Sequence, residues 1–371
     1  MDLEALVRNL RRVREAAPGA ALLPMVKSNA YGMGLAPVAR HIAASLEPDA
    51  LWGFGVATVA EGEALRESAG WTGRVVVTAP TPPGEYERAA RAGLTLALSE
   101  VEAVRRWADA ARAVGRRLPF HTEVDTGMGR AGFPAAEVEA WGPMVVDAAR
   151  DLLEWEGCFT HFHSADEADL ASADAQEERF REVLARLPEG GPRRVLHTSN
   201  SAAAVRRAGY RGDVVRPGIF MYGGEAGPGT RPEPVAALRA RVGLVRRVPP
   251  GTTVGYGATY TARREERWAT LTIGYGDGLP RRLAAAGGEA LVRGRRVPII
   301  GRISMDMTVV DLSDVQGDVR AGDVATLIGR DGADEIRVDD VAARCGTISY
   351  EILTGLGLRL PRTYPGALAG A

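Results

Sequence analysis

Eight short apolar runs, separated by stretches with helical spacing, occupy the first two-thirds of this chain. Each run is typical of a strand buried on both faces, because its apolar residues are nearly continuous. Helix-like stretches such as VEAVRRWADAARAV precede the runs, which are residues 21–28, 51–57, 74–80, 94–99, 119–124, 154–162, 194–199 and 214–223. Eight such units predict a (β/α)8 TIM barrel. A doubly wound open sheet is the alternative, although it usually has fewer strands.

The alternation ends at GGEAGPGTRPEPV, residues 223–235, a stretch rich in Gly and Pro that has no apolar periodicity. Such a stretch is typical of a linker. Beyond it, runs such as WATLTIGYG and DVATLIGR are separated by turn residues, as antiparallel strands are. We therefore predict an α/β protein with a barrel over residues 1–232 and a mainly antiparallel β domain over residues 233–371.

Charge and hydropathy argue against nucleic acid and membrane partners. The formal net charge is −1 and arginines are interspersed with acids, so no strongly basic face is expected. No apolar run approaches the length of a membrane span, and the N-terminal MDLEALVRNLRRVREA lacks the apolar segment of a secretory signal. Cys158 and Cys345 stand far apart in the sequence and are expected to be free thiols. These features predict a cytoplasmic protein.

Lys27 is the only lysine in a chain that otherwise uses arginine for its basic residues. A primary amine can form a Schiff base with an aldehyde, whereas a guanidinium does not give up the proton that this reaction requires. Lys27 follows an apolar run and precedes the NAYG turn, which favours a position at the end of a buried strand over one on the surface. We interpret Lys27 as a functional amine.

Polar residues collect where the eight runs end, which is where barrel enzymes carry their reactive groups. The SNS and RPGI segments near the seventh and eighth runs supply a hydroxyl and glycine-flanked backbone N–H groups, as a phosphate site requires. The polar and glycine-rich ends hold Lys27, Tyr31, Asp125, Arg130, His161, His163, His197, Asn200, Ser201, Arg216, Gly218 and Ile219. A lone amine beside a phosphate cradle predicts pyridoxal 5′-phosphate as the cofactor and no metal.

The motifs are similar to those of the alanine racemase family, the fold-type III pyridoxal phosphate enzymes. VKSNAYGMG resembles the family's cofactor-lysine motif, and further blocks follow in the family's order. They are DTGMGR, THFHSADE, HTSNSAA, RPGIFMYG, VGYGATYTA, IGYGDG, GRISMDM and the SYE near residue 350. The resemblance covers nearly the whole chain. Any one block is weak, whereas all of them in register are specific.

The resemblance implies that Lys27 binds the cofactor covalently. Arg216 would face the pyridine nitrogen, and His197 would orient Arg216. Because arginine cannot act as an acid in this setting, that nitrogen stays unprotonated, which favours simple proton return over transamination. The remaining cofactor-binding residues would be Tyr31, His161, Asn200, Ser201, Gly218, Ile219 and Tyr350.

By the same resemblance, the reaction is the interconversion of L-alanine and D-alanine, which supplies D-alanine for peptidoglycan. Lys27 would serve one face of the substrate as a base, and Tyr256, oriented by His161, would serve the other. In the family this tyrosine comes from the partner subunit, so a homodimer with composite active sites is implied. Substrate-binding residues would be Arg130, Met305, Asp306 and Tyr275, the last limiting the size of the substrate's side chain.

Two positions depart from the family's pattern. The family often has a carbamylated lysine two residues before the DTGMGR aspartate, where this chain has Glu123. A carbamate and a glutamate both carry one negative charge, so Glu123 is the expected charge partner of Arg130, directly or through a water. The sequence also starts at what resembles the family's first helix, so either the β domain has one strand fewer than the family usually has or the start is truncated.

The sequence is also compatible with other functions. A racemase for another small amino acid, such as serine, would need nearly the same pocket, because pockets discriminate weakly against one added hydroxyl. The HFHSADE segment is also compatible with a metal-dependent barrel hydrolase, although that reading leaves Lys27, Arg216 and the β domain without a role. A non-catalytic cofactor-binding barrel would not need Tyr256 and Met305. A fold-related decarboxylase would prefer an acid at position 216.

Overall fold

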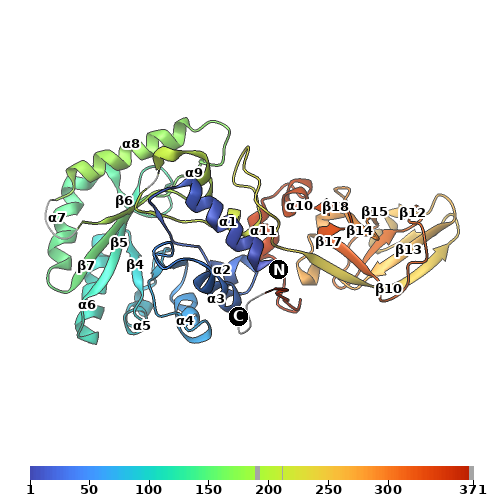
Figure 1. The fold of residues 1–371 in the computed structure, drawn as a ribbon, viewed down its shortest axis with the longest axis horizontal. Coiled ribbons are helices and arrows are strands. Elements are labelled where there is room, and N and C mark those ends of the chain that lie inside the picture. The colour runs from blue at the N-terminus through green and yellow to red at the C-terminus, as the bar shows by residue number, and fades with distance from the viewer. Residues whose placement is uncertain (189–192, 211, 367–371) are drawn as a thin grey trace.

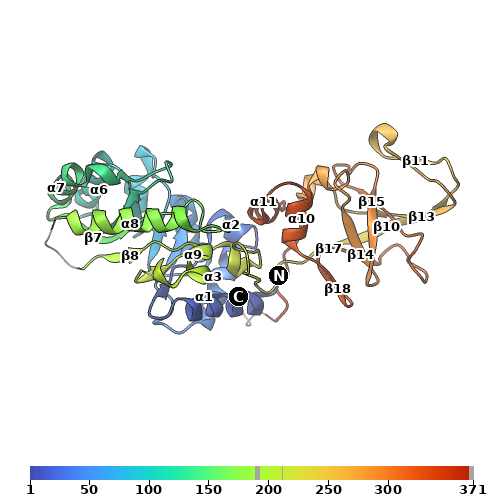
Figure 2. The ribbon, with the colours of Figure 1, turned by 90° about the horizontal axis from the view of Figure 1, so that it is seen from above.

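The computed structural model describes residues 1–188, 193–210 and 212–366 and has two parts joined end to end. Figure 1 shows the helix-covered barrel on the left and the smaller β domain on the right. The N-terminus lies near the junction between the two parts, in this view and from above (Figure 2). None of the described helices is long and apolar enough to span a bilayer.

Eight parallel strands among the described residues form the ring of the barrel, as predicted. They are β1 (Ala21–Leu22), β2 (Phe54–Val56), β3 (Val75–Val77), β4 (Thr95–Leu98), β5 (Leu118–Asp125), β7 (Leu153–Phe159), β8 (Val195–His197) and β9 (Val214–Val215). Strands β2, β3, β4, β5, β7 and β8 form one continuous sheet, and β1 pairs with β9. Parallel bridges join the β1 segment to that of β2, and the Asp213 N–H donates to the Leu196 carbonyl at 2.7 Å, which connects β9 to β8. The ring is therefore closed.

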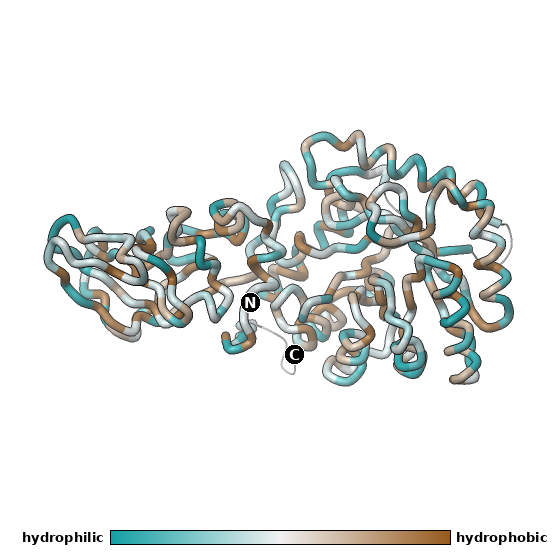
Figure 3. The backbone as a smooth tube through the Cα atoms, turned by 180° about the vertical axis from the view of Figure 1, so that it is seen from behind, coloured by the Kyte–Doolittle hydropathy of each residue, from teal (hydrophilic) through white to brown (hydrophobic). Residues whose placement is uncertain are grey.

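Amphipathic helices cover the outside of the ring. They are α1 (Leu3–Ala16), α3 (Leu35–Ser45), α4 (Val59–Ser68), α5 (Tyr86–Arg91), α6 (Val101–Val114), α7 (Val138–Ala149), α8 (Ala171–Arg186) and α9 (Ser201–Arg206). In α6, for example, Val104, Trp107 and Ala111 are buried at spacings of three and four, which places them on one face. The outer helices accordingly alternate between hydrophilic and hydrophobic segments in Figure 3.

The second part is an antiparallel β domain, also as predicted. Its sheet runs β10 (Leu238–Val248), β13 (Glu266–Leu271), β16 (Thr308–Asp311), β15 (Arg295–Ile300), β14 (Glu289–Val292), β17 (Val324–Asp331) and β18 (Asp334–Ile336). Because β10 pairs with both β13 and β17, the sheet closes on itself. The ends of the hairpin β11 (Thr253–Val254) and β12 (Tyr260–Thr261) flank the Tyr256 turn. The described residues before α1 contain no strand.

The C-terminal segment returns to the barrel after α10 (Val338–Arg344). Helix α11 (Ser349–Thr354) packs on α2 (Lys27–Tyr31), and the Tyr364 hydroxyl donates to the Met33 carbonyl at 2.7 Å. This C-terminal segment therefore packs against the barrel beside the Lys27 turn. The domain boundary at residue 232 stays a prediction.

Candidate active site

A cavity of about 370 Å³ opens where the barrel strands end, and most of the predicted site residues line it. Those residues are Lys27, Tyr31, Glu123, Arg130, His161, Asn200, Ser201, Arg216, Gly218 and Tyr350. They come from strand ends spread around the ring and, for Tyr350, from α11. The parallel arrangement brings them together because all eight strands point to the same rim.

Lys27 stands at the start of a turn with an unusual backbone. The next four residues, Ser28 to Tyr31, all have φ between 53° and 55°, in the left-handed region. For residues with a Cβ this conformation costs about 1–2 kcal/mol each. The Ser28 N–H donates to Glu61 Oε1 at 2.6 Å, and Asn29 Oδ1 accepts from the Leu35 N–H at 2.8 Å. These bonds hold a strained turn that sets the direction of the Lys27 side chain.

The surroundings of Lys27 favour its neutral form. Burial lowers the pKa of the Lys27 amine, and the positive charges of Arg130 and Arg216 lower it further, whereas Glu61 raises it. A neutral amine is the nucleophile that reacts with an aldehyde. The site therefore activates the one lysine of the chain.

A small cradle lies beside Lys27. The Gly218 N–H donates to Ser201 Oγ at 2.7 Å, and a Cβ added at Gly218 would lie 2.5 Å from Tyr31 Oη. The Ile219 N–H has no acceptor among the described residues. Only glycine at position 218 leaves this space, so the cradle matches an anionic group such as the phosphate of the implied cofactor.

Aromatic rings form one wall of the cradle. Tyr31 stacks on Tyr222 with ring centroids 4.6 Å apart, and Tyr350 lies 5.8 Å from Tyr31. The Tyr222 hydroxyl donates to the Met25 carbonyl at 3.0 Å. Burial raises the pKa of Tyr31 and of Tyr350, so both phenols keep their protons and can donate to an anion.

Both terminal nitrogens of the Arg216 guanidinium donate hydrogen bonds to neighbouring residues. Nη1 donates to His197 Nδ1 at 2.9 Å and to the His197 carbonyl at 2.5 Å. Nη2 donates to the carbonyls of Thr160 and Thr198 at 2.8 and 3.2 Å. Nε has no partner among the described residues, while the side chain lines the cavity. Burial lowers the pKa of Arg216 to about 10, so it remains a charged donor at neutral pH.

His161 lies against this arginine. Its Nδ1 is 3.3 Å from Arg216 Nη2, and burial together with Arg216, Arg130 and Lys27 lowers the pKa of His161 to about 3. His163 instead is exposed, and its Nδ1 bonds to Ser164 Oγ at 2.7 Å. A histidine surrounded by cations is a poor metal ligand, and the two imidazoles have separate partners. The hydrolase reading of HFHSADE therefore has no support in the geometry.

Glu123 and Arg130 both line the cavity but do not form an ion pair. Neither side chain makes a hydrogen bond to a described residue, although both line the cavity. Burial raises the pKa of Glu123, and the charges of Arg216 and Arg130 oppose that rise. The two side chains are thus close enough to interact electrostatically, and the Arg130 guanidinium is left free for a substrate carboxylate.

The remaining predicted residues lie outside this cavity. Tyr256 is 66% exposed in a turn of the β domain, and the hairpin that carries it lies at the end farthest from the barrel (Figures 1 and 2). Tyr275 and Met305 adjoin one another, because the Gly276 N–H donates to the Met305 carbonyl at 2.8 Å. Asp306 pairs with Arg359 at 2.7 Å. Within one chain these residues do not meet Lys27.

Several residues of the site were not predicted. Glu61 anchors the Lys27 turn, Thr78 and Phe159 line the cavity, and His121 and Glu156 lie behind His197. His121 does have a signal in the sequence, because it is a histidine inside an apolar run. No comparable signal in the sequence identifies the other four, which are Glu61, Thr78, Phe159 and Glu156.

The closed barrel, the activated lysine, the anion cradle and the β domain together define a pyridoxal phosphate enzyme of the barrel class. Comparisons with known proteins agree. The model described as "Alanine racemase, N-terminal domain" matches residues 1–226, and "Alanine racemase, C-terminal domain" matches residues 235–364. The alanine racemase of Symbiobacterium thermophilum is 39% identical over 374 residues, which cover 100% of this chain and 97% of that protein. The chain belongs to the alanine racemase family.

Solved structures of alanine racemases are also similar to this chain in fold. Alanine racemase from Streptomyces coelicolor A3(2) has a TM-score of 0.91 and 37% identity, covering 99% of this chain and 97% of its own. Alanine racemase from Bartonella henselae, solved with covalently bound pyridoxal phosphate, has a TM-score of 0.87 and 28% identity, covering 98% of both chains. The predicted family and fold class are confirmed, and the chain is an amino-acid isomerase.

Proposed function

We propose that the protein interconverts L-alanine and D-alanine with pyridoxal 5′-phosphate bound at Lys27. One observation supports this most directly. The only lysine of the chain has a lowered pKa and shares a cavity with a glycine-floored anion cradle and a buried arginine. The Bacillus anthracis alanine racemase, whose structure carries bound L-Ala-P, is 35% identical over 98% of this chain.

The cofactor, when bound, withdraws electrons from the substrate's α-carbon and so makes its proton removable. The chain's own residues do the rest. Tyr31, Ser201 and Tyr350 would bind the cofactor's phosphate, and Arg216 would face its ring nitrogen as a donor that does not give up a proton. Lys27, whose lowered pKa favours the neutral amine, moves the proton on one face of the α-carbon. Arg130 binds the substrate carboxylate.

The second base is Tyr256 of a partner subunit in this proposal. Its exposure and its place at the far end of the β domain support a site completed by a second copy. The β domain also exposes Tyr275, Met305 and Met307 to at least 40%, which is costly for a surface that nothing covers. We infer a head-to-tail homodimer with two composite sites.

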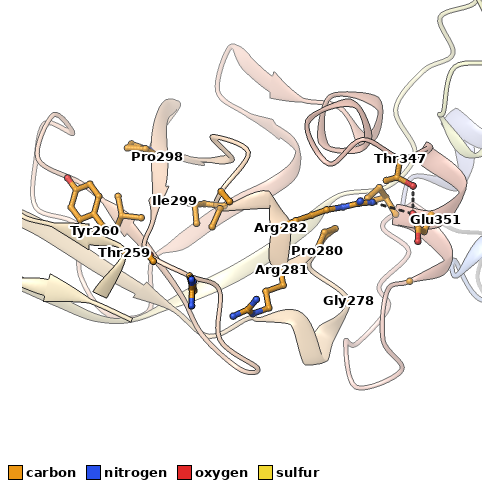
Figure 4. Close-up of a pocket in the computed structure, with 17 residues that line it drawn as sticks. Thr259, Tyr260, Gly278, Pro280, Arg281, Arg282, Pro298, Ile299, Thr347 and Glu351 are labelled. Atoms are coloured by element: carbon orange, nitrogen blue, oxygen red, sulfur yellow. Dashed lines mark hydrogen bonds and ion pairs between the residues drawn. The ribbon is translucent and has the colours of Figure 1, made fainter. Parts of the chain in front are cut away.

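A groove on the β domain lies beside the segment that carries Tyr256. It has a volume of about 1190 Å³ and runs from Thr259 and Tyr260, just after the Tyr256 turn, to Glu351 of α11 (Figure 4). Apolar Pro298 and Ile299 line it, and Arg282 reaches toward Glu351 at 3.7 Å. A mixed apolar and charged groove next to Tyr256 fits the rim of the partner's barrel.

D-alanine produced in this way would serve peptidoglycan synthesis, and we place the protein in the cytoplasm. The thiols support that location. Cys158 and Cys345 are free and buried, and burial raises the pKa of Cys158 to about 11, so its thiol stays protonated. Free cysteines are typical of a reducing compartment.

Borohydride trapping tests the cofactor assignment. The protein is incubated with pyridoxal phosphate, reduced and digested, and we expect one modified peptide, which carries Lys27. Before reduction, a portion of the same preparation is assayed for racemisation of alanine and serine by α-proton exchange in D2O. Lys27→Arg keeps the positive charge and serves as the control. Label on the wild type without exchange for either amino acid would contradict the racemase; absence of label would contradict the cofactor site.

A further inference from the structure

A chain of buried hydrogen bonds leads from Arg216 away from the cavity. Arg216 Nη1 lies 2.9 Å from His197 Nδ1, and His197 Nε2 lies 2.7 Å from His121 Nδ1. Arginine can only donate, so His197 Nδ1 must be the acceptor. A neutral imidazole carries one proton, which then sits on Nε2. That proton points at His121 Nδ1.

The tautomer of His121 follows from that of His197 by the same reasoning. Because its Nδ1 accepts, its proton is on Nε2, which lies 3.3 Å from Glu156 Oε2. Glu156 Oε1 accepts from Arg74 Nε at 2.9 Å, near the opposite end of the barrel from the cavity. We call the series Arg216, His197, His121 and Glu156 the relay. In it, each residue donates to the next, from the guanidinium at the cavity to the Glu156 carboxylate.

The barrel is shaped around the two imidazoles. His121 and His197 are both fully buried. A Cβ added at Gly157 would lie 2.7 Å from the His121 ring, and Phe159 stacks on His197 with centroids 4.6 Å apart. Burial lowers the pKa of both histidines, in keeping with neutral rings. A buried polar chain is retained in an apolar core only when its members satisfy one another, as these do.

We propose that His121 and Glu156 are positioning residues that hold His197 in its Nε2–H tautomer and thereby aim Arg216 into the cavity. The functional role of this arrangement rests on the proposed function, because the group that Arg216 would face is the ring nitrogen of the cofactor. Without His121, the other tautomer of His197 becomes competitive. That tautomer sets an N–H against Arg216 Nη1, and the guanidinium must move.

Histidine-selective ¹⁵N NMR tests the relay directly, since the chain has only five histidines to assign. Two-bond ¹H–¹⁵N spectra report the tautomer of each ring, and arginine Nη signals report Arg216. The spectra are recorded with cofactor bound and on cofactor-free protein. The variants are His121→Leu, which removes the acceptor, and His121→Asn, whose Oδ1 stands near the position of Nδ1. Glu156→Leu removes the far carboxylate at a partly exposed position.

We expect Nε2–H tautomers for His121 and His197 in the wild type. His121→Leu should lose the single His197 tautomer and shift the Arg216 signals, and His121→Asn should restore both. Glu156→Leu should give a mixture of the two His121 tautomers. If the His121→Leu variant does not fold, the Glu156→Leu spectrum decides the test. With cofactor bound, His121→Leu should lower kcat for alanine and leave KM nearly unchanged, because Arg130 is untouched.

Unchanged His197 and Arg216 signals in His121→Leu would overturn the proposal, as would wild-type tautomers in Glu156→Leu. A fall in kcat that His121→Asn does not reverse would equally count against positioning. The cofactor-free spectra do not depend on the racemase assignment. A failed borohydride label with the expected tautomers would therefore reject the function and retain the relay.

Discussion

The backbone N–H of Ser28 donates to Glu61 Oε1 at 2.6 Å, which ties the Lys27 turn to the first turn of helix α4. The other oxygen, Oε2, accepts from the N–H groups of Ala57 and Thr58 at 2.8 and 3.2 Å. One carboxylate thus completes a capping box and braces a left-handed turn. Its charge also raises the pKa of Lys27, against burial and the nearby arginines.

Glu61→Gln should therefore affect both stability and the reactive amine. Loss of the charged acceptor weakens the cap, and we expect the free energy of unfolding to fall by about 1–2 kcal/mol. The pKa of Lys27 should also decrease, because the one group that raises it most is gone. Lysine-selective ¹³C NMR shows a single side chain here and measures that pKa. Glu63→Gln changes a carboxylate of the same helix α4 and loses an ion pair with Arg88 of α5, so it is the matched control and should leave the pKa of Lys27 unchanged.

Stability of the cofactor-free protein should rise with pH on account of Lys27. The ordinary pKa of lysine is 10.5, and the folded protein lowers it. Below the pKa that Lys27 has in the folded protein, the half-buried ammonium is charged and destabilises the fold in full. Above that value the folded state loses its proton before the unfolded chain does, so stability increases up to about pH 10.5. Denaturant midpoints of wild type and Lys27→Met across pH measure the difference, and parallel curves would refute this linkage.

Gly218→Ala should damage the cradle. The new Cβ would lie 2.5 Å from Tyr31 Oη, and relieving such a contact costs about 1–3 kcal/mol. We expect a lower melting temperature and a Kd for pyridoxal phosphate raised at least about tenfold, since the phosphate and the methyl group compete for one space. Gly84→Ala, where an added Cβ meets nothing within 4 Å, should change neither quantity. Tight cofactor binding by the Gly218 variant would remove the cradle from the proposed site.

Mixing two inactive variants tests the composite active site. Lys27→Ala and Tyr256→Phe homodimers should each lose roughly 10²–10⁴-fold or more in kcat, as expected when a proton-transfer group is removed. After subunit exchange, each heterodimer has one intact site, so an equal mixture should regain about a quarter of wild-type activity. No recovery after verified exchange would place both bases in the same chain, contrary to the proposed dimer.

Glu123 should make the enzyme independent of carbon dioxide. A glutamate already carries the negative charge that a carbamylated lysine acquires from CO2, and here it faces the charges of Arg216 and Arg130. We expect equal racemisation rates in degassed and bicarbonate-containing buffer. Glu123→Lys should be slow in degassed buffer and recover with bicarbonate. A bicarbonate response in the wild type, or none in the lysine variant, would contradict this role for Glu123.

Local patterns were sufficient to predict most of this fold. Continuous apolar runs such as residues 74–80 become strands buried on both faces, and residues 101–114 form the helix that their spacing indicates. Lys27 and Arg216 were predicted to belong to one site because strand ends of a parallel barrel share a rim. Exact strand ends were not predicted correctly: residues 214–223 contain only the two-residue β9, because Pro217 and Gly218 turn the chain into the cradle.

The left-handed turn at Lys27 and the relay behind Arg216 became visible only in the folded molecule. Ser28 and Asn29 have no local preference strong enough to predict such a backbone; the distant Glu61 carboxylate stabilises it. His121, Glu156 and Arg74 come from separate parts of the sequence, and barrel closure brings them into hydrogen-bonding distance. Periodicity reports which face of a strand is buried, whereas the partner of a buried polar atom depends on how the strands are packed around the ring.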